Sequence, residues 1–414
     1  MATSPIDDQI DRLSSLPDDL LSTILSFLPI RTAARTSVLC RRFRHLWQTS
    51  PSLHLISRDF CPHYFAAMVD SAVLRRSPSY PLLSLRLELS EYRHSPQTET
   101  LLPCLFHKAC SLGLRHLTIE GCKLNPLSYT LFLIFSVNSL TSLSLPTLTF
   151  GRRGCLFPSA AALTNLKTLS VECYAVHSDK LNLLLSQLCS LEDLSIGVST
   201  LRVFNLSSQT IKILKLTMLI GAPELGTVDL RLPSLELLHI ENDGLLQLPL
   251  FQGEIPLLRK SIISLDEIRE KYCSAVPGLL NSISHTEELV LRIEESDREL
   301  GPFSILLEPG KEPTKFPNLK HLEVTMCFHK HNFEDIVTLI HHSPALESLK
   351  LVHKALFSNV LTRKRKRDDW RSMLTHNADG NHNYIHFTNL HIGQHREEFV
   401  KLVSKQCTSV KKMG

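Results

Sequence analysis

Side chains that bind metal ions gather in one stretch of the sequence, "CFHKH", at residues 327–331. Cys327, His329 and His331 lie in it, and His341 and His342 follow shortly afterwards. Thiolate and imidazole are ligands that zinc prefers, but structural zinc sites join two separated ligand pairs at characteristic spacings. This stretch lacks a second cysteine pair. We therefore expect polar residues on a loop and at a helix end, with no metal site and no cofactor.

Acidic side chains occur as neighbours in the sequence, at 287–288, 294–295 and 397–398. Neighbouring residues point apart on a helix or strand, so a shared acid/base role has no geometric support. The sequence also contains no G-x-S-x-G, G-x-x-x-x-G-K-[ST], G-x-G-x-x-G or H-E-x-x-H motif. We therefore predict no catalytic residue and do not expect an enzyme.

Five adjacent cations form the run "RKRKR", followed by Asp368 and Asp369. The run consists of Arg363, Lys364, Arg365, Lys366 and Arg367. Like charges repel each other and resist burial, so the run predicts an exposed loop. Two interpretations stay open: a nuclear localisation signal or phosphate-contacting patch, and a solvated insertion without such a role.

The composition is that of a globular protein, with 43% hydrophobic and 21% charged residues among 414. A formal net charge of +4 is too small over this length to indicate a nucleic-acid partner. Eleven cysteines without a C-x-x-C pair suit a reducing compartment. The acidic start of the sequence and the short apolar run "LFLIF" predict neither a signal peptide nor a membrane span. We expect a soluble intracellular protein of the nucleus, the cytoplasm or both, with no membrane partner.

The elements that position any functional surface begin with "LPDDLLSTILSFLP" at residues 16–29. Pro17 and Pro29 predict the start and end of a helix. At roughly 100° per residue, its apolar side chains spread over about 160°. "IRTAARTSVLC" and "CRRFRHLW" predict two further short helices. Three helices in about 35 residues fall below the length that normally folds alone, so either the rest of the chain or another protein covers them.

Residues 11–47 resemble a plant-type F-box, through "LPDD", "ILSFLP", "TSVLCRR" and the closing Leu-Trp. Two departures, "LPIR" and Phe43, keep the shape and charge type of the usual residues. The resemblance implies docking onto the Skp-type adaptor, and through it onto the cullin, of an SCF ubiquitin ligase. The residues in or beside that interface would be Leu16, Pro17, Leu20, Leu21, Ile24, Leu25, Leu28, Val38, Leu39, Cys40 and Trp47.

The middle of the chain repeats the template L-x-x-L-x-L. From Leu114 the steps between matches are 26, 26 and 25 residues, within the range of leucine-rich repeats. The next steps, of 10, 10, 14 and 10 residues, predict strand, tight turn and strand without a helix. Because one unit cannot bury its own apolar edge, the units must stack. The expected fold class is an α/β repeat: a three-helix F-box, an irregular leucine-rich-repeat solenoid with a parallel concave β-sheet, and a small α+β C-terminal module.

The residues between the template positions face outward from this sheet and are predicted to bind a protein target. They are Arg115, His116, Lys167, Glu192, Asp193, Lys320, His321 and Glu323. Their charges are of mixed sign, so neither nucleic acid nor a membrane is indicated as the ligand. The identity of the target does not follow from them.

The C-terminal quarter first predicts strand, helix and strand, with Ile336, Leu339 and Ile340 on the buried face of the helix and Pro344 at its end. "FTNLHIGQHREEFVKLVSKQCTSVKKM" then resembles the end of the FBD module of plant F-box/leucine-rich-repeat proteins. The predicted parts are a flexible tail (1–10), the F-box (11–58), the repeats (59–352, irregular near 241–285), an exposed basic insertion (353–383) and an FBD-like module (384–414) whose final strand is short or missing.

The resemblance implies a substrate-recognition subunit of an SCF-type E3 ubiquitin ligase. The F-box would bind the adaptor while the repeats hold a protein target, and catalysis would belong to other subunits. The apolar stretch "YFAAMVDSAVLRR" between the F-box and the repeats predicts a stiff junction. A ligase-independent interaction scaffold is the alternative that the sequence leaves open.

Overall fold

A computed structural model of the protein describes residues 13, 15–89, 96–121, 129–148, 160, 162–173, 178–198, 203–218, 227–242, 250–252, 255–266, 275–294, 313–326, 338–340, 342–353, 384–388 and 411–412. The chain forms two compact units. The first comprises residues 1–148 and 158–168, and the second comprises residues 149–157 and 169–414.

The first unit begins with a small helical module. Its elements are α1 (Asp18–Ser26), α2 (Ile30–Arg35), the short 3-10 helix η1 (Thr36–Val38) and α3 (Phe43–Thr49). Pro17 precedes α1, and Pro29 precedes α2, which confirms the predicted helix limits. Proline is suited to these places because its fixed φ fits a first turn and its ring ends the preceding helix.

The rest of the first unit alternates strands with helices. The elements are β1 (Ser52–Ile56), η2 (Ser57–Asp59), α4 (Pro62–Val69), η3 (Asp70–Leu74), β2 (Ser84–Glu88), α5 (Pro96–Ser111), β3 (His116–Glu120), α6 (Tyr129–Phe135) and β4 (Ser142–Leu148). β1, β2, β3 and β4 pair in parallel and in that order. The first match to the template begins at Leu82 and leads into β2, so the sheet starts one strand earlier, at the residues that follow the helical module.

The second unit continues the strand pattern. Its elements are β5 (Thr168–Cys173), α7 (Ser178–Gln187), β6 (Asp193–Val198), β7 (Val203–Ser207), β8 (Ile213–Met218), β9 (Thr227–Arg231), β10 (Leu237–Asn242), β11 (Leu250–Gln252), β12 (Lys260–Asp266), α8 (Ala275–Ser282), β13 (Glu288–Glu294), β14 (His321–Met326), β15 (Ser348–His353), β16 (Tyr384–Thr388) and β17 (Lys411–Lys412). The main sheet of this unit has the order β5-β6-β8-β10-β12-β13-β14-β15-β16-β17.

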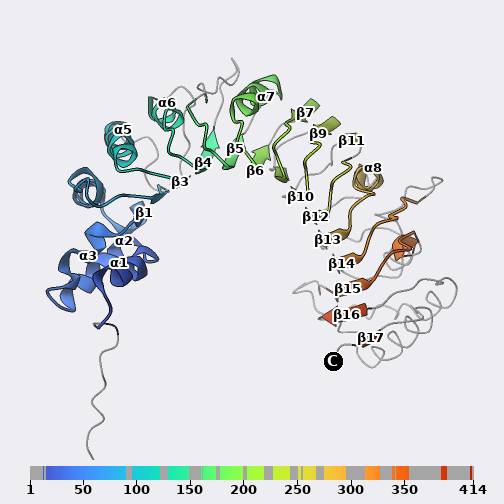
Figure 1. Ribbon diagram of the computed structural model, residues 1–414, viewed down its shortest axis with the longest axis horizontal. Helices are drawn as coiled ribbons and strands as arrows, with labels where there is room; N and C mark the ends of the chain where they lie inside the picture. The colour runs from blue at the N-terminus through green and yellow to red at the C-terminus, as the bar shows by residue number, and fades with distance from the viewer. Residues whose placement is uncertain are drawn as a thin grey trace, which may run out of the picture. The chain divides into compact units, whose positions relative to one another are not determined.

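The short steps in the repeat confirm the predicted alternation of strands without helices. β7, β9 and β11 form a separate three-stranded parallel sheet, with α7 beside β7 and α8 beside β11. All five elements lie on the same side of the main strands (Figure 1). Asn182 of α7 satisfies the edge of β7: its amide donates to the carbonyl of Asn205 at 2.9 Å and accepts from the Ser207 N–H at 3.1 Å. We call the opposite face of the main sheet the solvent face.

The stretch that showed no clear repeat, near 241–285, contains a regular strand. β12 pairs in full register with β10 and β13. The template fails there because Ser261 and Thr286 occupy two of its leucine positions. Both side chains are fully buried, and the Ser261 hydroxyl lies 3.4 Å from the Thr286 hydroxyl. The expected irregularity is therefore a replacement of leucine by serine and threonine in the core, and the main sheet continues through it.

The last predicted elements are described in part. β14 and β15 stand where two template matches predict strands, and Leu339 between them is buried as expected. Two described strands lie near the C-terminus. β16 ends at Thr388, in the first residues of the segment that resembles the FBD module, and the two-residue strand β17 lies near the end of that segment and pairs with β16. The rest of that segment and the basic run at 363–367 lie outside the described residues.

Candidate functional site

The first candidate site is a group of exposed apolar side chains on the helical module. Leu20, Ile24 and Phe27 lie along one face of α1, because residues four and seven apart return to the same side of a helix. Their exposed fractions are 51%, 41% and 81%. Val38 and Leu39, at the end of η1, are 88% and 63% exposed. We call these five residues the exposed apolar face.

The other side of α1 belongs to the core of the same module. Leu21 and Leu25 are 1% and 4% exposed, and Trp47 is buried with them. The resemblance places Leu21, Leu25 and Trp47 in or beside the adaptor interface, and their burial puts them beneath the exposed side chains. Leu16, Pro17, Leu28 and Cys40 are exposed or half-buried and stay beside the face. Phe27 is not among the residues that the resemblance names, yet it is the most exposed of the three, and its spacing from Leu20 and Ile24 places it on the same side.

Arg42 fixes the segment after η1 against the start of α1. Its guanidinium donates to the Asp18 carboxylate and to the Leu16 carbonyl, both at 2.5 Å. Hydrogen bonds between a cation and a carboxylate are stronger than neutral ones. The two stretches that carry the exposed apolar face are therefore held on one scaffold.

The free energy available at this face is large for its size. Covering one Leu, Ile, Val or Phe side chain is worth about 1.5–3 kcal/mol. These five side chains are already covered in part, and the freedom lost on association offsets some of the gain, so the face supplies part of the roughly 8 kcal/mol that a micromolar complex requires. An exposed apolar group of this kind marks an interaction site.

Arg76 joins this module to the strands that follow. Its side chain is 5% exposed and donates to the carbonyls of Thr49 (3.0 Å), Ser50 (2.6 Å), Tyr80 (2.7 Å) and Pro81 (3.1 Å). Burial lowers the pKa of Arg76 to about 10, so the guanidinium stays charged at neutral pH. One buried cation thus holds the end of α3 and the residues before β2 together, in keeping with the predicted stiff junction.

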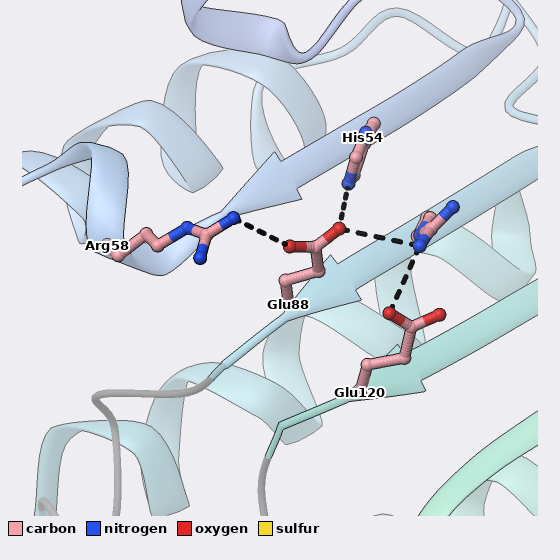
Figure 2. A network of polar contacts seen from close by, with 5 residues as sticks. His54, Arg58, Glu88 and Glu120 are labelled. Atoms are coloured by element: carbon pink, nitrogen blue, oxygen red, sulfur yellow. Dashed lines mark hydrogen bonds and ion pairs between the residues drawn. The ribbon is translucent and has the colours of Figure 1, made fainter. Parts of the chain in front are cut away.

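A second set of polar contacts lies on the first three strands (Figure 2). Glu88 of β2 binds the His54 ring at 2.7 Å and lies 3.9 Å from Arg58 and 3.5 Å from Arg86. Arg86 also lies 3.1 Å from Glu120 of β3. Pro29 additionally forms a parallel bridge with His54, so the α1–α2 connection is tied to β1. The backbone bridge joins the helical module to β1, and the side-chain contacts join β1 to β2 and β3.

The predicted target-binding residues of the first unit lie at the starts of strands. Arg115, His116 and Lys167 are exposed. The Thr141 N–H donates to the Arg115 carbonyl at 2.8 Å, and the Lys167 N–H donates to the Thr141 carbonyl at 2.9 Å. Arg115 and Lys167 therefore stand two steps apart in one row across the sheet.

In the second unit the corresponding row alternates in charge. Each residue donates its backbone N–H to the carbonyl of the one before it, at 2.8–2.9 Å. We call it the alternating row; it runs Glu192, Lys212, Glu236, Arg259, Glu287, Lys320 and Glu347. Every neighbour in the row has the opposite charge.

Several of the predicted target-binding residues form ion pairs with neighbouring residues of the sheet. Glu192 pairs with Lys212 at 3.1 Å, and Lys320 pairs with Glu287 at 3.0 Å. This contact lowers the pKa of Glu287 and raises that of Lys320. Glu323, further along β14, pairs with Lys350 at 3.1 Å. Burial raises the pKa of Asp193, and His321 is exposed between Glu288 and Ser348 in the register.

Within the described ranges no three His, Cys, Asp or Glu side chains are placed to hold a metal ion. His342 binds the Thr338 carbonyl through Nδ1 at 2.8 Å, while Cys327, His329, His331 and His341 lie outside those ranges. The part of the chain that the structure describes also contains no helix long and apolar enough to cross a membrane.

Comparison with known proteins assigns the helical module and the repeats to families. Residues 13–55 match the F-box domain model, and residues 73–392 match the model described as At1g61320/AtMIF1, LRR domain. "FBD-associated F-box protein At5g56370" of Arabidopsis thaliana is 29% identical over 83% of this chain and 75% of its own length. "Putative FBD-associated F-box protein At5g22720" is 30% identical over 82% and 73%.

A third relative from the same plant, "F-box/FBD/LRR-repeat protein At5g56420", is 26% identical over 83% of this chain and 77% of its own length. The F-box match spans the helical module and β1, and the repeat match covers more than half of the chain. The chain belongs to the plant family of F-box/leucine-rich-repeat proteins that includes the FBD-associated F-box proteins.

Proposed function

We propose that this protein is a substrate-recognition subunit of an SCF-type E3 ubiquitin ligase. F-box proteins as a class act in such ligases. The exposed apolar face would bind the Skp-type adaptor, and through it the cullin, while the repeats would hold a protein target. The observation that carries the proposal is that Leu20, Ile24, Phe27, Val38 and Leu39 stay exposed on a module whose core is already filled.

The proposed mechanism is positioning. A subunit that holds a target near a charged ubiquitin-conjugating enzyme raises the effective concentration of the acceptor lysine, to the millimolar range for a well-matched link. That gain requires a stiff connection between the adaptor-binding face and the first repeats. The four carbonyls bound by Arg76 and the contacts around Glu88 supply such a connection within the first unit. The bond-forming chemistry would belong to other subunits.

The test is capture of a purified Skp-type adaptor by the full chain and by Phe27→Asp. A carboxylate at the centre of an apolar interface is expected to cost about 2–4 kcal/mol of binding free energy. The matched control is Phe132→Asp, because Phe132 of α6 is also exposed, at 59%, away from α1. Both variants should unfold at the same temperature as the parent chain.

Capture that survives Phe27→Asp and Leu20→Asp equally would overturn the adaptor assignment. Capture of adaptor without cullin would instead favour the ligase-independent scaffold. Substitutions at Leu21 are unsuitable for this test, since its side chain lies in the core and its loss would unfold the module.

A further inference from the structure

Four aliphatic side chains lie together on the solvent face of the second unit. The register pairs Ile213 of β8 with Leu237 of β10, and Ile262 of β12 with Val290 of β13. Leu237 and Ile262 stand on neighbouring strands, two positions apart along them. Ile213 is 38% exposed and the other three are half-buried, although all four lie on the face opposite the core. We call these four residues the aliphatic stripe.

The strands on either side are polar at the same positions. β6 carries Asp193 and Ser195, and β14 carries His321, Glu323 and Thr325. Four strands at about 4.8 Å spacing span about 14 Å, the length of about four extended residues. The stripe is therefore a bounded surface of the size that a short peptide segment covers.

The lysines around the stripe are neutralised within the sheet. Lys215 lies 2.6 Å from Glu241, and Lys260 lies 2.9 Å from Glu288. These pairs leave no net charge beside Leu237 and Ile262.

Arg292 is different. It is exposed, lies two residues after Val290 on the same face of β13, and has no hydrogen bond or ion pair with any residue the structure describes. Its register neighbours are Ser264 of β12 and Thr325 of β14, whose hydroxyls are small and polar. A guanidinium without a partner beside two hydroxyls suits a carboxylate, which it binds through two parallel N–H donors.

His239 completes the surroundings. It lies on β10 between Lys215 and Ile262 in the register. Burial lowers its pKa, as do the charges of Lys215 and Arg292, while Glu241 acts in the opposite direction. The lowered pKa leaves the ring with little positive charge at pH 7. Arg292 is therefore a cation beside Val290 that has no ion pair among the described residues, while the carboxylate of Asp193 lies at the opposite end of the stripe, beside Ile213.

We propose that the aliphatic stripe and Arg292 bind a short segment of the target protein in which an apolar side chain precedes an acidic one. The apolar side chain covers Leu237 and Ile262, and the carboxylate meets Arg292. The inference deepens the proposed function, since it depends on the repeats holding a protein target. Charge complementarity selects the occupant: Arg292 offers a cation at the β13 end of the apolar stripe, away from Asp193 at the β8 end, and the segment supplies the matching anion and apolar group.

The experiment selects displayed random peptides of about ten residues, long enough to span the stripe, on the immobilised full chain. The selected peptides are expected to carry an aliphatic or aromatic residue followed by Asp or Glu. Ile262→Asp should weaken their binding at least about tenfold, and Arg292→Glu should replace the acidic preference by a basic one. The matched control is Val352→Asp, which places a carboxylate on the same face of β15, two strands beyond β13, and should change nothing.

Three results would overturn the proposal: peptides without an acidic residue, equal binding by the parent chain and Ile262→Asp, or a dimer of this chain that Ile262→Asp dissolves. The last result would assign the stripe to a second copy of the protein. Adaptor capture is measured separately on the same variants. A chain that binds the peptides but no adaptor would refute the proposed ligase role alone, and a chain that binds adaptor but no peptide would refute the stripe alone.

Discussion

The exposed apolar face of the F-box and the alternating row of the repeats each contain residues that the sequence predicts to bind partners, among them Leu20 and Ile24 in the first and Glu192 and Lys320 in the second, yet the two surfaces differ in one property. Leu20, Ile24 and Phe27 stay largely exposed among the residues that the structure describes. Glu287 and Lys320 bind each other instead. A surface whose groups are already paired must break those pairs before it can bind anything. Exposure alone therefore does not identify a binding residue; the absence of a partner within the chain does.

The largest expected effect separates the two sides of α1. Leu21→Ala should cost about 2–5 kcal/mol of unfolding free energy, because it opens a cavity in a filled core. Leu20→Ala, one residue earlier on the exposed side, should change stability by no more than about 0.5 kcal/mol. Urea denaturation measures both. Equal losses would mean that Leu20 is covered by the chain in solution and that the exposed apolar face is smaller than described.

The junction gives an effect of similar size. Arg76→Met removes the donors for four carbonyls in a buried place and should destabilise the first unit by about 3–5 kcal/mol. Arg75→Met is the matched control, since the Arg75 side chain is 78% exposed and its ion pair among the described residues is with Asp70, at 2.6 Å. Chemical denaturation followed by tryptophan fluorescence compares them, because Trp47 lies in the F-box core.

The two variants also distinguish a stiff junction from a merely stable one. Adaptor capture should survive Arg76→Met at low temperature, because the exposed apolar face does not contact Arg76, while transfer of ubiquitin to a bound target should fall. Unchanged transfer would show that the junction does not need Arg76 to position the target.

How well the sequence predicted each region depends on whether that region carries a recognisable local pattern. The prolines of the F-box marked the limits of its helices, and three near-equal steps marked the repeats. The template did not identify the strand β12, because it requires leucine-like residues at core positions. Two of these positions hold Ser261 and Thr286, whose hydroxyls lie together in the core. The ion pairs within the sheet could not be predicted from the sequence either, since Glu287 and Lys320 are 33 residues apart in the chain. Contacts across repeats follow from register, which a template does not encode.

The hydroxyl pair yields an intermediate effect. The Thr286 hydroxyl lies 3.0 Å from the carbonyls of both Arg259 and Glu288, besides its contact with Ser261. Thr286→Val should cost about 1–3 kcal/mol of unfolding free energy, because it leaves the buried Ser261 hydroxyl without its hydrogen-bond acceptor. Ser261→Ala should cost about 1 kcal/mol, and the double variant less than the sum. A double-mutant cycle measures the difference, and strict additivity would show that the two hydroxyls do not interact.

The smallest expected effect tests whether the alternating row acts as a row or as separate pairs. Exchanging the charges in one chain, by Glu287→Lys with Lys320→Glu, restores the central pair but places like charges next to Arg259 on one side and next to Glu347 on the other. If pairs alone matter, the exchanged chain should be as stable as the parent. If the row matters, it should unfold at a lower denaturant concentration, because each of the exchanged residues then faces one attractive and one repulsive neighbour. The difference should vanish near 1 M salt, where the screening length is only about 3 Å. A deficit that persists at high salt would mean that the two side chains are held by packing, and the contrast with the apolar face would then rest on shape instead of charge.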